Sequence, residues 1–282
     1  MTEFAYGSYN LGNGGIDDGD DTRLRRQLAM LAGTGADAWA LQECKGFSAS
    51  GFRALFLAEQ VLDMRAFLVP SGHHGCDLAV LVAETASLLV TGVRHEQGPP
   101  YWHAVARVSV QVRGFGPLHL ASAHLAPSSP VQRLAEAESL ALIARDSPVI
   151  AGGDWNAMPA ADPDPPLDHI DPGHARRKLD RSAARAIEEA GFTDIAAHLG
   201  NQAPTAGHAG PGKLAYRCDR IYTTLPATAI TGYEVVTEDR PASDHRPVLA
   251  RFSLASVSPA STGLPGDASP AALLQQNTIQ AK

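Results

Sequence analysis

Two short segments place a carboxylate beside a second polar side chain. The segment AGGDWNA carries Asp154 and Asn156, and the segment ASDHRPV carries Asp244 and His245. In an extended segment, side chains two residues apart leave the same face, so Asp154 and Asn156 can act on one ligand. A carboxylate, a carboxamide and an imidazole can together hold a hard cation, orient a phosphate and move a proton. Either segment alone would also fit a polar loop after a strand, whereas the two together favour a functional site.

Further polar positions stand at the ends of short apolar, strand-like runs. They are Asn10 after an alternating run, Gln42 and Glu43 after AWAL, His124 after HLASA, and Asp219 at the start of a later run. Rigid strands that end in polar groups present chemistry at one edge of a β scaffold, while loops shape the pocket. We therefore expect these side chains to gather with the two segments above at one edge of a sheet.

The hydrophobic pattern that must position these groups predicts many short strands and few helices. Strands are expected over residues 4–11, 38–42, 66–69, 77–82, 88–93, 103–112, 118–123, 149–151, 221–224, 232–236 and 248–254. Helices are expected over residues 22–31, 52–64, 130–145 and 182–190. The acidic residues 17–21 should cap the first helix, because Asp is favoured at a helix start. This content indicates two sheets packed face to face.

The order of the polar groups resembles that of a known family. Asn, Gln-Glu, His-Leu, Gly-Asp-x-Asn, Asp-x-Ile and Ser-Asp-His follow one another between about residues 4 and 252, which is similar to the endonuclease/exonuclease/phosphatase family. The strings GDWN and SDHRPV are the most specific parts, and HLAPSSP is most similar to the deoxyribonuclease I branch. The resemblance implies an α/β (α+β) fold: a deoxyribonuclease I-like four-layer sandwich of two face-to-face mixed β-sheets flanked by helices.

The same resemblance implies a metal cofactor and its ligands. Glu43 would be the principal ligand of Mg²⁺ or Mn²⁺, with Asp244 and Asn10 as further ligands, directly or through water. Oxygen ligands of this kind suit a hard cation that keeps several waters.

Catalytic roles follow from the resemblance in the same way. Asp154 would orient or deprotonate the attacking water, and Asn156 would hydrogen-bond a phosphate oxygen. His245 would contact the scissile phosphate or act as general base, with Asp219 fixing its tautomer. His124 would bind the phosphate or protonate the leaving oxygen. Which of these groups is the base is left open.

Three positions depart from the family pattern. Trp155 stands where members commonly carry Phe or Leu, a tolerable change in a packed position. Gly12 stands where some members carry an acidic or aromatic residue, which leaves one metal ion or two open. Arg220 follows Asp219 where many members have Tyr, and it could either contact phosphate or face solvent.

The net charge of the chain argues against a protein that binds nucleic acid tightly. The net charge of the chain is −7, and basic residues form only short clusters, Arg23 to Arg26 and Arg176 to Lys178. Tight non-specific nucleic-acid binders usually carry a basic face. We therefore expect a phosphoester substrate, with any nucleic acid bound weakly, and we expect the first basic cluster to be a solvated face.

The cysteines predict neither a disulfide framework nor a metal cluster. Cys44, Cys76 and Cys218 form an odd and sparse set without the spacing of metal ligands. We interpret Cys44 and Cys218 as small buried fillers.

Two long loops and the C-terminal segment complete the organisation of the chain. Loops are expected over residues 158–178 and 201–213, where His169, His174 and His208 are interpreted as exposed loop histidines rather than substrate contacts. Residues 1–254 are expected to form one catalytic domain. Residues 255–282 are rich in Ser, Pro, Ala and Gln and are expected to be a disordered tail. No apolar run approaches the ~20 residues of a membrane span, and no signal peptide is expected, so we expect a cytoplasmic monomer.

The functional prediction is a metal-dependent phosphoesterase that hydrolyses a phosphodiester by attack of water on phosphorus. Nuclease-like and small-molecule phosphodiesterase activities both remain open. The alternatives are a phosphomonoesterase acting on a small molecule or lipid head group, and a catalytically weak binding protein on the same scaffold.

Overall fold

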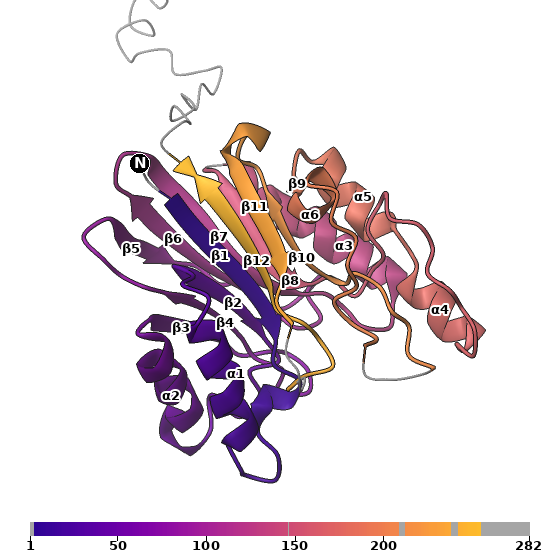
Figure 1. Cartoon of the computed structure of the whole chain (residues 1–282), viewed down its shortest axis with the longest axis horizontal. Helices are drawn as coiled ribbons and strands as arrows, with labels where there is room; N and C mark the ends of the chain where they lie inside the picture. Colours follow the sequence, from indigo (N-terminus) through magenta and orange to yellow (C-terminus); the bar gives the residue numbers. More distant parts are fainter. Residues whose placement is uncertain (1–2, 146, 209–211, 238–241, 255–282) are drawn as a thin grey trace, which may run out of the picture.

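The chain folds into two six-stranded sheets that pack face to face between layers of helices (Figure 1). The computed structural model describes residues 3–145, 147–208, 212–237 and 242–254. The predicted tail over residues 255–282 lies outside the described residues. No helix in the described part of the chain is long and apolar enough to cross a membrane.

Each sheet combines parallel and antiparallel neighbours. The first sheet has the order β11-β12-β1-β2-β4-β3, and the second has the order β5-β6-β7-β8-β10-β9. The first is built from β1 (Glu3–Asn10), β2 (Ala38–Gln42), β3 (Arg65–Val69), β4 (Leu78–Val82), β11 (Ile230–Val235) and β12 (Val248–Ser253). The second is built from β5 (Leu88–Val93), β6 (Val105–Val112), β7 (Gly116–His124), β8 (Val149–Asp154), β9 (Thr193–Asp194) and β10 (Asp219–Thr223).

Helices cover the outer face of each sheet. The helices are α1 (Thr22–Ala32), α2 (Arg53–Leu62), α3 (Pro130–Ala141), α4 (Pro172–Lys178), α5 (Ser182–Glu189) and α6 (Ile195–His198). Apolar side chains of α1 and α2 join one core cluster with the first sheet, and those of α3 and α5 join another with the second sheet. The largest cluster lies between the two sheets. The predicted four-layer sandwich is therefore confirmed.

Strand direction brings the polar strand ends to one edge of the sandwich. Strands β1 and β2 are parallel, with Asn10 opposite Gln42. Strands β7 and β8 are parallel, with His124 opposite Asp154, and antiparallel β10 begins with Asp219 opposite the same Asp154. Because parallel strands end together and antiparallel strands begin where their neighbours end, all these residues meet at one edge.

The two sheets approach each other closely beneath this edge. A Cβ atom on Gly152 would stand 2.7 Å from the Cβ of Ser8, so no larger residue fits between β8 and β1 without displacement. Buried polar side chains also join the sheets here, since Gln42 Nε2 donates to Ser122 Oγ at 2.9 Å. The contact between the sheets explains Gly152, whereas Gly153 is required because a Cβ atom there would stand 2.2 Å from the Ala123 carbonyl oxygen of the neighbouring strand β7.

The predicted elements agree with the structure in order and type, with three exceptions. The short elements β9 and α6 were missed, and α4 lies inside a segment that was expected to be a loop. Helix α4 does carry start signals, because Asp171 accepts a hydrogen bond from the His174 amide and Pro172 follows it. The acidic segment before α1 does not supply the expected side-chain cap, because the N-cap residue Asp21 makes no capping hydrogen bond. Its neighbour Asp20 instead accepts from the Thr22 amide at 2.9 Å through Oδ1.

Candidate active site

Asp154, the last residue of β8, lies at the centre of the polar edge. Its carboxylate is almost fully buried. Asn10 Nδ2 donates to Asp154 Oδ2 at 3.2 Å, and His124 Nε2 and His245 Nε2 lie 3.5 and 3.8 Å from the same oxygen. Burial opposes ionisation of Asp154, but the nearby imidazoles, His245 first among them, hold the pKa of that carboxyl below its ordinary value. Three polar side chains therefore converge on one anionic oxygen.

Asn10 links Asp154 to Glu43, the predicted principal metal ligand. Its Nδ2 donates to Glu43 Oε1 at 3.3 Å, while Glu43 Oε2 accepts from the Asn13 amide at 2.8 Å. Glu43 directly follows β2 and adopts a positive φ of 52°, which turns the chain sharply at the strand end. One carboxamide therefore bridges carboxylates contributed by different sheets.

Asp244 stands at the rim of the same edge. It is exposed, and its Oδ1 would lie 3.6 Å from a Cβ on Gly12, two residues after Asn10. Ser243 ties this segment to β1, because Ser243 Oγ donates to the Asn10 carbonyl oxygen at 2.9 Å. Gly12 has a φ of +61° and leaves room for this approach, so only a small residue suits the position.

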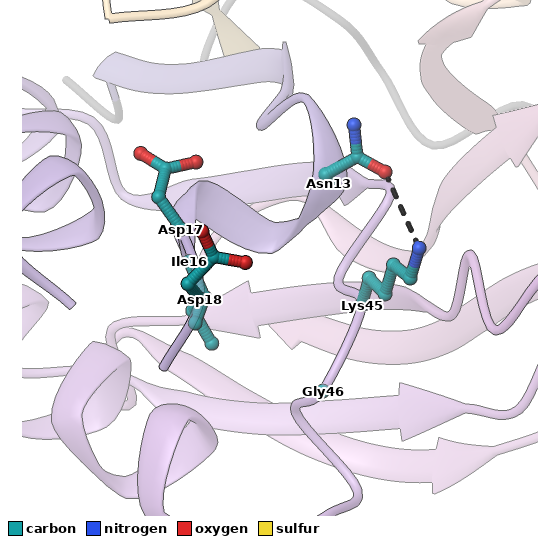
Figure 2. A pocket seen from close by; sticks show the side chains of 6 residues that line it. All are labelled: Asn13, Ile16, Asp17, Asp18, Lys45 and Gly46. Carbon is teal, nitrogen blue, oxygen red and sulfur yellow. Dashed lines mark hydrogen bonds between the residues drawn. The ribbon is translucent and has the colours of Figure 1, made fainter. Parts of the chain in front are cut away.

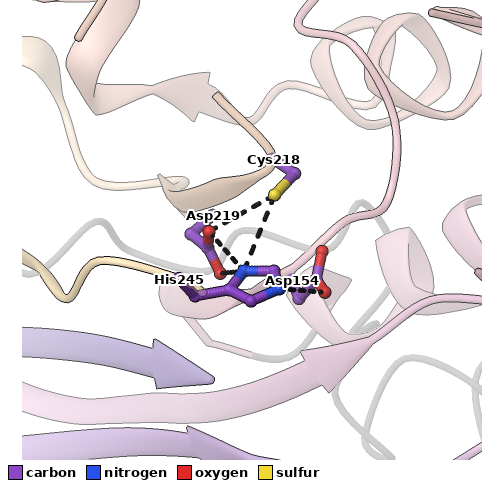
Figure 3. Close-up of side chains that lie close together, drawn as sticks. All are labelled: Asp154, Cys218, Asp219 and His245. Carbon is purple, nitrogen blue, oxygen red and sulfur yellow. Dashed lines mark hydrogen bonds and ion pairs between the residues drawn. The ribbon is translucent and has the colours of Figure 1, made fainter. Parts of the chain in front are cut away.

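His245 forms a dyad with Asp219, as Figure 3 shows. Its Nδ1 donates to the two carboxylate oxygens of Asp219 at 2.9 and 3.0 Å. Burial is the largest single influence and lowers the pKa of His245, but Asp219, Cys218 and Asp154 together raise that pKa well above its usual value. The Nε2 atom therefore faces Asp154 as a proton donor.

Cys218 supports this dyad. Its Sγ donates to Asp219 Oδ2 at 3.3 Å and lies 3.8 Å from His245 Nδ1. Burial, reinforced by Asp219, raises the pKa of the Cys218 thiol to about 12, so the thiol keeps its proton. The prediction of a small buried residue is confirmed, and the structure adds a hydrogen bond to the predicted orienting carboxylate.

His124 ends β7 and is held by another imidazole. The ring of His103 stacks on it, with centroids 4.4 Å apart and planes inclined by 22°. Burial lowers the pKa of His124 by more than Asp154 and Glu43 raise it, and burial lowers the pKa of His103 to about 3. Both rings are therefore neutral near pH 7, in contrast to His245.

Asn156 is positioned by its backbone and by a lysine from α4. Its φ is 49°, its amide donates to Asp154 Oδ1 at 2.9 Å, and its Nδ2 donates to the Leu125 carbonyl oxygen. Lys178 Nζ donates to Asn156 Oδ1. Burial lowers the pKa of Lys178, which marks an ammonium group that is largely withdrawn from solvent.

A cavity lies beside Asn13 and Lys45, close in sequence to Asn10 and Glu43 (Figure 2). It has a volume of about 430 Å³ and is lined by Asn13, Ile16, Asp17, Asp18, Lys45 and Gly46. Asn13 joins it to the site, since the amide of that residue binds Glu43 and its side chain accepts from Lys45 Nζ at 3.5 Å. The cavity wall therefore carries the negative carboxylates of Asp17 and Asp18 and the positive ammonium group of Lys45.

We compared the sequence with models of known protein families. The model of the endonuclease/exonuclease/phosphatase family matches residues 7–245. The chain belongs to this family. The match spans the polar residues that the structure brings together, from Asn10 to His245. No curated protein matches the sequence significantly.

Solved structures of similar proteins share the fold. D. rerio TDP2 humanized by 14 mutations is 17% identical, with a TM-score of 0.66 over 89% of this chain and 99% of that chain. An endonuclease/exonuclease/phosphatase from Beutenbergia cavernae is 18% identical, with a TM-score of 0.67 over 89% of this chain and 72% of that chain. ANGEL2, a 2′,3′-cyclic phosphatase, is 14% identical, with a TM-score of 0.62 over 90% and 95%.

The donor atoms at this edge fit a hard divalent cation. Oxygens of Glu43 and Asp154 both lie within 3.3 Å of the Asn10 amide nitrogen. Asp154, Cys218, Asp219 and His245 also place one potential ligand atom each within 4.8 Å of one another. In that second group the thiol is protonated and Asp219 occupies His245 Nδ1, so we interpret it as a hydrogen-bonded dyad. The oxygen-rich side around Glu43 suits Mg²⁺ or Mn²⁺ better.

Several contacts in this family member were missed or misassigned from the sequence. Arg220 neither contacts phosphate nor faces solvent: it is fully buried over the rings of Trp155 and Tyr222 and donates to the Ala157 carbonyl oxygen at 2.9 Å. His208 is half-buried and donates to the Ser243 carbonyl oxygen at 3.2 Å, so it is not an exposed loop histidine.

Lys178 and His103 were not identified from the sequence. The helix that ends at Lys178 did have a local signal, because Asp171-Pro172 marks a helix start and a short basic run follows it. His103 had none, since nothing in PPYWHA relates it to His124. Of the first basic cluster, Arg25 and Arg26 are exposed, whereas Arg23 donates to the carbonyl oxygens of Leu11 and Ala242.

Proposed function

We propose that the chain is a phosphodiesterase that depends on Mg²⁺ or Mn²⁺ and hydrolyses its substrate by attack of water on phosphorus. The observation that carries this proposal is the convergence of Asn10, His124 and His245 on one oxygen of the ionised Asp154. An ionised carboxylate can orient and deprotonate water, and the two imidazoles beside it can donate protons to phosphoryl oxygens.

Glu43 would hold the metal, with Asn10 and Asp244 as further ligands. The bound cation would neutralise charge on the phosphoryl oxygens. Asp154 would orient the attacking water. His245, kept protonated by Asp219, would donate to a phosphoryl oxygen.

His124 and Asn156 would complete the phosphate contacts. The neutral imidazole of His124 can donate through Nε2, which faces Asp154 at 3.5 Å. Asn156 would donate to a phosphate oxygen, and Lys178 would supply a cation beside it. Because these groups are buried, their hydrogen bonds to a substrate anion would be stronger than in water.

Two structural neighbours support a substrate in which the phosphoester belongs to a nucleotide or nucleic acid. One is D. rerio TDP2, solved in complex with single-strand DNA product, and the other is ANGEL2, a 2′,3′-cyclic phosphatase. The net charge of −7 favours weak binding of such a substrate, without an extended basic groove. We further propose that residues 1–254 form one monomeric catalytic domain.

Hydrolysis of bis(p-nitrophenyl) phosphate should require added Mg²⁺ or Mn²⁺ and should stop when EDTA is added. Metal binding should also raise the melting temperature, because a ligand that binds only the folded state stabilises it. Glu43→Gln should abolish that thermal shift, whereas Glu138→Gln, at an exposed carboxylate on α3, should retain it. An undiminished rate in metal-free buffer would contradict the proposal. Parallel assays on single-strand DNA, a 2′,3′-cyclic nucleotide and sphingomyelin would define the substrate class.

Lys178→Met should lower kcat/KM for the same substrate about 10- to 100-fold, since a hydrogen bond to a charged group contributes about 1.5–3 kcal/mol. Arg176→Met is the matched control, because Arg176 is an exposed cation on the same helix. If both variants retain the parental kcat/KM, Lys178 neither contacts the phosphate nor is needed to position Asn156.

A further inference from the structure

Two pairs of stacked aromatic rings extend from the phosphate site to the surface. In the inner pair, His103 stacks on His124 at 4.4 Å. In the outer pair, His73 stacks on Trp102 at 3.7 Å with planes inclined by only 11°. Trp102 and His103 are consecutive residues, so the backbone joins the two pairs. The proposed mechanism uses only His124 of these rings.

Exposure rises along this path. His103 is buried, Trp102 is half-buried, and His73 is exposed. His74, with its ring centroid 6.4 Å from that of Trp102, is also exposed. We call the rings of His73, His74 and Trp102 the aromatic platform. Only the ring of His103 separates the platform from His124, which faces Asp154.

The platform is held rigidly by buried polar groups. Glu136 Oε1 accepts from the Trp102 amide at 2.6 Å, and its Oε2 accepts from the Ala126 amide at 2.8 Å. Glu136 thereby fixes the segment that carries Trp102 and His103 to the segment that follows His124.

The loop that carries His73 and His74 is also anchored. Ser71 Oγ lies 2.8 Å from His103 Nδ1, and Asp77 Oδ1 accepts from the Ser71 amide at 2.9 Å. A preorganised surface of this kind binds a flat ligand with little ordering cost.

Two unsatisfied groups border the path. Within the described residues, neither Trp102 Nε1 nor His124 Nδ1 has a hydrogen-bond partner, although both atoms are buried. Buried polar atoms are usually paired, and an unpaired one calls for an explanation such as a bound water, ion or ligand. A ligand with polar edges as well as a flat face would match this surface better than a purely apolar group.

We propose that the aromatic platform is a stacking subsite for a nucleobase next to the scissile phosphate. This inference rests on the proposed phosphodiesterase function and assigns its substrate class, a nucleotidyl phosphodiester. Base stacking on aromatic side chains tolerates any base sequence, because every base has a flat π-face. It therefore supplies binding energy that a chain with a net charge of −7 does not gain from non-specific attraction to phosphates.

The test compares two substrates that share a leaving group, the p-nitrophenyl ester of thymidine 5′-monophosphate and methyl p-nitrophenyl phosphate. Trp102→Ala and His73→Ala should each lower kcat/KM for the thymidine ester about 5- to 150-fold, the range expected for a lost base stack. Both should leave kcat/KM for the methyl ester unchanged. Trp102→Phe should retain most of the thymidine preference. His198→Ala, at an exposed histidine on α6, should change neither value.

Binding supplies a readout that does not depend on turnover. By calorimetry, the parental protein should bind thymidine 5′-monophosphate more tightly than 2-deoxyribose 5-phosphate, and His73→Ala should remove the difference. Equal parental affinities, or equal losses on both ester substrates in the variants, would overturn the platform. If no phosphodiester is hydrolysed but base-dependent binding is lost in His73→Ala, the platform stands and the proposed catalytic function fails. His73 is exposed, so this variant decides the matter even if Trp102→Ala does not fold.

Discussion

Replacing Asp154 with asparagine is expected to lower kcat for phosphodiester hydrolysis about 10²- to 10⁴-fold, the range for loss of a general acid or base. The substitution conserves size but removes the charge on which Asn10, His124 and His245 converge. KM should change much less, because the lost interaction with the attacking water strengthens in the transition state.

Thermal stability separates this chemical effect from misfolding. Asp154 is buried at a point where the sheets are in close contact, so the melting temperature of the variant must be measured alongside kcat. Asp171→Asn is the matched control, because Asp171 is an exposed carboxylate that caps α4 and Asn is an equally good cap. A variant with parental kcat at Asp154 would show that the carboxylate is structural.

Alanine substitutions at His124 and His245 are each expected to lower kcat about 10²- to 10⁴-fold. The double substitution should cost less than the product of the two single effects, because residues that act as a unit are not additive. Both rings face the same oxygen of Asp154, which is the geometric basis for that coupling. Asp219→Asn should give a smaller loss in the same direction, since it weakens the partner that orients His245.

A structural interpretation of His124 makes a different prediction. Its ring stacks on His103, so His124→Ala could lower the melting temperature and leave kcat of the folded fraction intact. His119→Ala controls for this, because His119 lies on the same strand and its Nδ1 pairs with Ser109 Oγ at 2.9 Å. If the His124 and His119 variants lose similar stability and retain parental kcat, His124 belongs to the packing of β7 and not to the reaction.

Local sequence was sufficient for most of the fold and for the polar residues that gather at one edge of it. Strands such as β2 (Ala38–Gln42) were predicted at their observed bounds, because apolar content and polar termination are local properties. Asp154 and His245 were identified from their own short segments. The same locality explains the failure at α4, where Asp171 and Pro172 signalled a helix start within an otherwise loop-like composition.

Contacts between distant segments could not be predicted. Arg220 was expected to be a surface or phosphate-binding cation, yet it is buried over the ring of Trp155. Trp155 lies 65 residues earlier in the sequence, and its indole Nε1 donates to the carbonyl oxygen of Arg220. Lys178, the last residue of α4, donates to Asn156, which follows β8 and lies 22 residues earlier in the sequence. No residue pattern within either segment encodes such an approach.

The sequence by itself determined which groups take part at the polar edge and in what order the strands deliver them. Polar residues at strand ends are a periodic, local signal, and strand direction then places Asn10, His124 and Asp154 together. The tertiary structure alone decided the electrostatic state of the site. The pKa of His245 is raised because Asp219, Cys218 and Asp154 together outweigh burial, and the pKa of His124 is lowered chiefly by burial, against Asp154 and Glu43. These protonation states depend on burial and on charges brought close by folding, which are properties of the packed chain.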